Sequence, residues 1–226
     1  MLEGWSVNGI LTLQTGMPWS PFDQNNDFLG TGEINAASKT GASGVAQPWN
    51  YGGPPAAFKV TATPIPCFGS LSGCTPYTSA SYAGTPTQTV CQNAATAPYA
   101  GNAKLQALAL AALANGACYT QNGSILTPPA YGTIGNASKG IFVGQSYKNV
   151  DFSVSKLWRL KESYSAQFRV EFFNIFNRTN FAAPGTDPSK GLGGGFGYPK
   201  NTPDSANPVL GSGGPRHIQF GFKFAF

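Results

Sequence analysis

The sequence predicts an all-β fold: the last four antiparallel strands of a transmembrane β-barrel, with a long extracellular loop that contains a short helix. Only 10% of the 226 residues are charged, against roughly 25% in ordinary globular domains. The 29 glycines, 18 prolines and 13% aromatic residues favour strands joined by irregular loops. Segments of alternating polarity lie at both ends of the chain, and the connections between them are long, short and long.

Four segments alternate apolar and polar residues with a period of two, which is typical of strands with two different faces. Their approximate bounds are residues 4–14, 149–160, 164–177 and 217–226. The alternation is imperfect in the second segment, where Lys156 falls among apolar residues. The last segment has an unbroken apolar face, formed by Ile218, Phe220, Phe222, Phe224 and Phe226.

The connections between these segments differ sharply in length. Residues 161–163 join the second and third strands, whereas residues 15–148 and 178–216 form the other two connections. Outer-membrane barrels have short periplasmic turns and long extracellular loops. We therefore expect the short turn and Phe226 at the periplasmic rim, both long loops outside the cell, and residues 1–226 within one barrel domain.

The two faces of the strands predict two different environments. No second set of strands is visible to cover the apolar face, so we expect it to contact the lipid of the outer membrane, with a soluble sheet as the alternative. The polar face then lines a hydrated lumen, where cross-strand ion pairing and direct contact with a substrate are both open. Its charged members are Asp151, Arg159, Arg169, Glu171 and Lys223.

The sequence of residues 15–148 predicts a loop with little regular structure. The exception is one helix at residues 102–115, which Gly116 would end. The four cysteines of this loop, an even number, suit an oxidising compartment and two disulfides, with reduced thiols as the alternative. Three pairings are open, and we expect disulfides to compensate for the absence of a core in this loop. The candidates are Cys67, Cys74, Cys91 and Cys118. The glycine-rich residues 191–197 predict a flexible stretch.

Nothing in the sequence points to catalysis, a metal site or a cofactor. The chain has a single histidine, His217, and no G-x-S-x-G motif that could supply a nucleophilic serine for it. Asp23, Asn25 and Asp27 have the first spacings of a calcium loop, but Phe28 replaces its glycine, so an Asn/Asp-rich turn is expected. The 14 basic residues are scattered, which argues against nucleic-acid binding. No apolar run reaches the roughly 18–20 residues of a transmembrane helix.

Both ends of the chain resemble one family. The ending Gly214–Phe226 resembles the last strand of TonB-dependent outer-membrane receptors, and its terminal aromatic face resembles the signal that the barrel-assembly machinery recognises. Residues 167–177 with Asn180-Phe181 resemble the penultimate strand of the Oar-like subgroup, which often carries a carboxypeptidase-regulatory-like domain and is abundant in Acidobacteria. Gly4-Trp5, Gly9-Ile10 and Gln14–Pro18 together resemble the strand that precedes the loop in this subgroup.

The resemblance implies a 22-stranded barrel with an N-terminal plug, coupled through TonB to the inner-membrane proton gradient. The chain begins without a secretory signal, so we expect it to be the C-terminal part of such a receptor, with the plug domain absent. Its partners would be the rest of the barrel and the plug, the barrel-assembly machinery, and TonB only through the N-terminal part. The ligand stays open among oligosaccharide, peptide and metal chelate. The alternative is a surface-exposed binding or adhesion module in which residues 15–148 are the functional part.

Overall fold

The computed structural model describes residues 3–32, 47–54, 58, 63–77, 86–161, 163–203 and 213–226. The chain is mostly β, its sheets are antiparallel, and it divides into two units. The first, called here the strand unit, comprises Met1–Gly16, Gln145–Ala182 and Lys200–Phe226. The second, the loop unit, comprises Met17–Gly144 and Ala183–Pro199.

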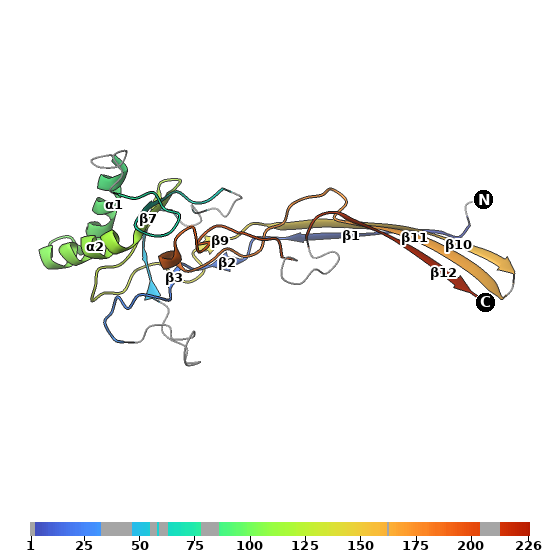
Figure 1. Cartoon of the computed structure of the whole chain (residues 1–226), viewed down its shortest axis with the longest axis horizontal. Coiled ribbons are helices and arrows are strands. Elements are labelled where there is room, and N and C mark those ends of the chain that lie inside the picture. Colours follow the sequence, from blue (N-terminus) through green and yellow to red (C-terminus); the bar gives the residue numbers. More distant parts are fainter. Residues whose placement is uncertain are drawn as a thin grey trace. The chain divides into compact units, whose positions relative to one another are not determined.

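The strand unit is one sheet of four long strands in the order β1-β10-β11-β12, seen side by side in Figure 1. Their bounds are Trp5–Gln14, Tyr147–Lys161, Tyr164–Phe173 and His217–Ala225. Each strand is antiparallel to its neighbours. The start of β1, the β10–β11 turn and the end of β12 therefore share one end of the sheet, and both long connections leave from the other. Glu162 of that turn lies outside the described residues.

The register aligns the apolar residues of all four strands. Val7 lies opposite Val154, which lies opposite Val170, which lies opposite Phe220. Directly opposed residues of an antiparallel pair point to the same face, so the rows build one apolar face and one polar face. Within the described part of the chain, β1 and β12 are the edges of this sheet, and the sheet is open.

The predicted third strand, residues 164–177, is too long, because β11 ends at Phe173. Asn174 and Asn177 have φ angles of 51° and 50°, in the left-handed region that breaks a strand. The Asn174 side chain holds this bend: it accepts from the Arg178 amide and donates to the carbonyls of Arg178 and Gly214. The second strand is longer than predicted, at residues 147–161 instead of 149–160.

The expectation that the long loop builds no core was wrong. The loop unit contains a sheet of four short strands in the order β5-β8-β7-β6, with bounds Asn50–Gly52, Ser124–Thr127, Ala117–Gln121 and Cys67–Gly69. Its other paired strands are β2 (Pro18–Trp19) with β9 (Phe142–Val143) and β3 (Phe22–Asp23) with β4 (Gln47–Pro48). A cluster of buried aromatic residues packs with this sheet: Trp19, Phe28, Trp49, Phe58, Tyr119, Phe142 and Phe196.

Two helices form a smaller core with β7. The predicted helix is present as α2 (Ala103–Asn115), where the Asn102 side chain accepts from the Leu105 amide as an N-cap. A second helix, α1 (Pro86–Thr96), was not predicted, and a short 3₁₀ turn, η2 (Ala97–Tyr99), follows it. Cys91, Ala95, Leu113 and Cys118 are buried together. Among the described residues, no helix is long and apolar enough to cross a membrane.

The glycine-rich residues 191–197 are packed, which contradicts the expectation of a flexible stretch. They follow a 3₁₀ turn, η3 (Pro188–Lys190), and the Gly193 amide donates to the Ser72 carbonyl over 2.9 Å. A Cβ atom on Gly191 would lie 2.3 Å from that same carbonyl oxygen. Glycine is needed here because the two backbones approach so closely.

Candidate functional site

The five charged residues predicted to line the lumen lie on one face of the strand unit. The register pairs Arg159 with Ser165 and Gln167 with Lys223, and it places Asp151, Arg169 and Glu171 on the same side. Arg169 and Glu171 form an ion pair at 3.4 Å, but they are neighbours along β11. Their cross-strand neighbours are uncharged, so the described residues of this sheet do not form the cross-strand ion pairs expected for this face.

Asp151 has a structural role at the loop end of the sheet. One of its carboxylate oxygens accepts from the Asn174 backbone amide and from the Asn149 side chain, both at 2.9 Å. It therefore stabilises the bend that ends β11. His217 begins β12 opposite Phe173, at the same end.

The residues predicted as the assembly signal form an exposed aromatic face on β12. Phe220 and Phe222 are 67% and 69% exposed. The row continues onto β11, where Phe168 stacks with Phe220 and Tyr164 with Phe224, at ring-centroid distances of 6.2 and 6.4 Å. An apolar face this large is unfavourable in water and marks a surface that contacts lipid or another protein. It consists of Ile218, Phe220, Phe222, Phe224 and Phe226 on this strand.

Lys156 interrupts the apolar face near the end of the sheet that carries the β10–β11 turn. The Lys156 ammonium lies 5.2 Å from the centre of the Trp5 ring and donates to the Glu3 carbonyl. An amphipathic pair of this kind suits the boundary between an apolar layer and water, since lysine extends its charge while its stem stays on the apolar surface.

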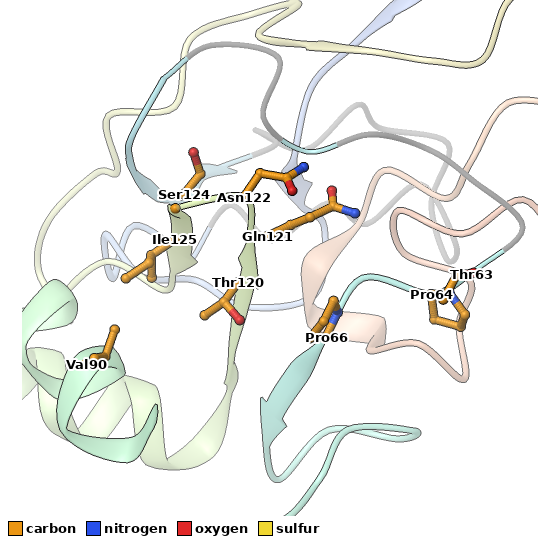
Figure 2. A pocket seen from close by; sticks show the side chains of 10 residues that line it. Thr63, Pro64, Pro66, Val90, Thr120, Gln121, Asn122, Ser124 and Ile125 are labelled. Atoms are coloured by element: carbon orange, nitrogen blue, oxygen red, sulfur yellow. The ribbon is translucent and has the colours of Figure 1, made fainter. Parts of the chain in front are cut away.

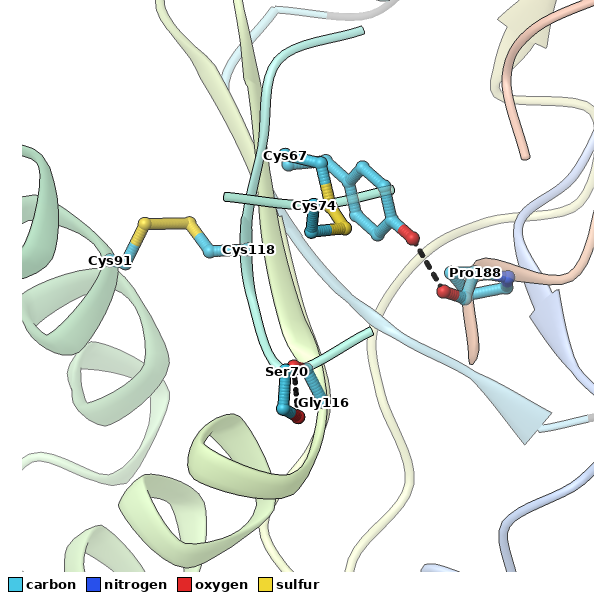
Figure 3. The surroundings of a disulfide bond; sticks show 8 residues. Cys67, Ser70, Cys74, Cys91, Gly116, Cys118 and Pro188 are labelled. Carbon is cyan, nitrogen blue, oxygen red and sulfur yellow. Dashed lines mark hydrogen bonds between the residues drawn. A yellow bond between two sulfur atoms is a disulfide. The ribbon is translucent and has the colours of Figure 1, made fainter. Parts of the chain in front are cut away.

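The four cysteines form two disulfides, Cys67–Cys74 and Cys91–Cys118. Figure 3 shows the second bond joining α1 to β7. The first bond closes a short turn next to β6, where Ser70 also donates to the Gly116 carbonyl. The pairing was left open by the sequence, because it depends on which segments the fold brings together.

Two carboxylates are buried in the loop unit, and one of them, Asp187, joins the two long connections. Asp187, 6% exposed, accepts from the side chains of Asn25 and Ser189 at 2.7 and 2.6 Å. Asp23, 1% exposed, accepts from the backbone amide of Asn25 and from the Trp49 indole. Burial raises the pKa of the Asp187 carboxyl above its usual range.

The two aspartates with calcium-loop spacing, Asp23 and Asp27, accept hydrogen bonds from N–H groups of the protein. Asp23 takes hydrogen bonds from two backbone amides, and Asp27 takes them from the amides of Gly30, Thr31 and Gly32. The bond from Gly32 is the main cause that lowers the pKa of Asp27. These are Asx-type turns. The described residues contain no group of three or more His, Cys, Asp and Glu placed to hold a metal ion.

An open groove of about 710 Å³ lies in the loop unit, on the side of the β7–β8 hairpin next to α1. The hairpin supplies residues 120–125, α1 supplies Val90, and the segment before β6 supplies Thr63, Pro64 and Pro66. In Figure 2, Thr120 lies between Val90 and Pro66. This groove could not be predicted from the sequence, because its walls are distant in the chain and its residues have ordinary loop composition.

Comparison with known proteins gives one match. The family model described as an outer membrane beta barrel domain matches residues 1–219. No curated protein and no solved structure matches the chain. Because the family model covers nearly the whole chain, the chain belongs to the outer membrane beta barrel domain family and is a protein of the outer membrane.

Proposed function

We propose that this chain is the C-terminal segment of a TonB-dependent outer-membrane transporter of the Oar-like subgroup. In this role it closes the barrel, presents the assembly signal on β12 and offers its loops to a ligand outside the cell. The barrel would have 22 strands, of which these are the last four. The segment is a transport component and not an enzyme.

The observation that carries the proposal is the sheet of the strand unit. One face is apolar and aromatic except where Lys156 interrupts it, the other is mainly polar, and β1 and β12 are edges in the described structure. Unpaired strand edges are not tolerated in hydrocarbon, so both edges need neighbours. The rest of the barrel is the natural partner, with a plug in the lumen and the assembly machinery as the partner that first contacts β12.

The assembly role is tested with the full-length protein and the substitution Phe224→Glu, which places a charge on the face expected to meet lipid. We expect the variant to lose the folded, heat-modifiable band in gels of outer-membrane fractions. Deletion of Phe226 should have the same effect. The matched control is Lys223→Gln, on the other face of the same strand, which should assemble normally. A normal heat-modifiable band for the Phe224→Glu variant would contradict the proposal.

A second function, a surface-exposed binding or adhesion module, is favoured by the loop unit. It has its own aromatic core and two disulfides, as a binding module that folds by itself would have. Deleting TonB in the source cells separates the two functions. Uptake by a TonB-dependent transporter should stop, whereas adhesion through the loop unit should continue unchanged.

A further inference from the structure

The groove beside the β7–β8 hairpin has the size of a site for a small ligand. Its volume of about 710 Å³ lies within the roughly 300–1,000 Å³ usual for such sites. It is mixed in character: Pro64, Pro66, Val90 and Ile125 offer apolar surface, and the hairpin adds side-chain hydroxyls and amides, those of Thr120, Gln121 and Asn122 among them. The ten described residues that line it include no ionisable side chain.

The two disulfides brace the walls of this groove. Val90 is next to Cys91, whose bond to Cys118 fixes α1 against the strand that carries Thr120. Pro66 is next to Cys67, which is bonded to Cys74. The Thr120 amide also donates to the Pro66 carbonyl over 3.0 Å. A site whose walls are fixed before binding loses less entropy when the ligand arrives.

The two strands beside the groove already have hydrogen-bonded neighbours on both sides. β7 and β8 are the inner strands of their sheet, so neither presents an unpaired edge, and the Thr120 amide is bonded to Pro66. An extended peptide recognised by strand addition needs such an edge. Among the described residues, the lining of the groove therefore combines polar side chains with an apolar surface and contains no charged group.

We propose that this groove binds a neutral oligosaccharide, whose hydroxyl groups meet the Thr120 hydroxyl and whose C–H faces pack on Pro66 and Val90. The proposal rests on the proposed function, since it names the ligand class that the surface loops would receive. A ligand recognised by charge, such as an anionic metal chelate, has no counter-charge among the described lining residues.

The test measures equilibrium binding to the oxidised full-length protein in detergent micelles, without any membrane energisation. The probes are an array of neutral oligosaccharides, an array of uncharged peptides and a ferric catecholate. Val90 is 43% exposed, so Val90→Trp should fill the groove without disturbing the core. The matched control is Leu110→Trp, at an exposed apolar residue of α2 outside the groove.

We expect a neutral oligosaccharide to bind, Val90→Trp to weaken it at least tenfold and Leu110→Trp to leave it within twofold. Thr120→Val, which removes one hydroxyl at nearly constant volume, should weaken it several-fold. The proposal is overturned if no neutral oligosaccharide binds, if Val90→Trp has no effect, or if the peptides or the ferric catecholate are the probes that Val90→Trp displaces. This binding needs no TonB. The binding test can therefore fail while TonB-dependent uptake is observed in cells, and it can succeed while uptake is absent, so failure of the ligand proposal is distinguished from failure of the proposed function.

Discussion

Phe196 packs against Tyr119 with their ring centroids 4.5 Å apart, although the two residues belong to different long connections of the chain. Phe196 is 1% exposed and Tyr119 is fully buried. The Tyr119 hydroxyl also donates to the Pro188 carbonyl over 2.6 Å, in the same segment as Phe196. The residues that follow β1 and the residues that follow β11 therefore fold together as one loop unit.

Removing this aromatic contact should destabilise the loop unit strongly. Phe196→Ala leaves a cavity beside Tyr119 and Trp19, and substitutions of this kind cost about 3–5 kcal/mol. Near-UV circular dichroism during urea unfolding of the full-length protein measures the loss. Phe176→Ala, at a residue that is 76% exposed, is the control and should change stability by under about 0.5 kcal/mol. Equal effects of the two substitutions would rule out a shared core.

The two disulfides should contribute unequally to stability. Cys91–Cys118 closes a sequence separation of 27 residues and Cys67–Cys74 one of 7. In the chain-entropy model the longer loop stabilises by about 1 kcal/mol more. Cys91→Ser/Cys118→Ser should therefore unfold at lower urea than Cys67→Ser/Cys74→Ser. The reverse order would indicate that contacts around the short loop outweigh the entropy of the unfolded chain.

Elements whose residue pattern is local could be predicted from the sequence alone. The four long strands alternate with a period of two because each faces two different surroundings, and α2 has its cap at Asn102. The alternation could not show where β11 ends, since residues 174–177 continue it in part and the bend depends on Asn174 reaching Gly214.

Most of the loop unit could not be predicted, because its core consists of residues far apart in the chain. Trp19, Trp49, Phe142 and Phe196 lie in four segments that are far apart in the chain, and only the fold brings them together. Helix α1 has weak apolar periodicity and is held by the burial of Cys91 and Ala95. The groove depends on the same long-range contacts.

The buried carboxylate that joins the two connections gives the loop unit a pH dependence with a defined sign. Burial raises the pKa of Asp187 above that of the unfolded chain, so folding is opposed by its charge at neutral pH. Its contribution to stability increases as the pH falls through the folded pKa and is complete below the unfolded value of about 3.8. Asp27 acts in the opposite direction, because hydrogen bonds lower its pKa and its contribution is lost on acidification.

Asp187→Asn separates these two contributions. The asparagine cannot titrate, so the free energy of unfolding of the wild type minus that of the variant should rise as the pH falls from 7 to 4. Asp27→Asn is the matched control, and the corresponding difference should fall over the acidic part of that range. Urea unfolding at a series of pH values, followed through the near-UV signal of the loop unit, measures both. A difference for Asp187→Asn that decreases on acidification would show that its hydrogen bonds to Ser189 and Asn25 outweigh its burial.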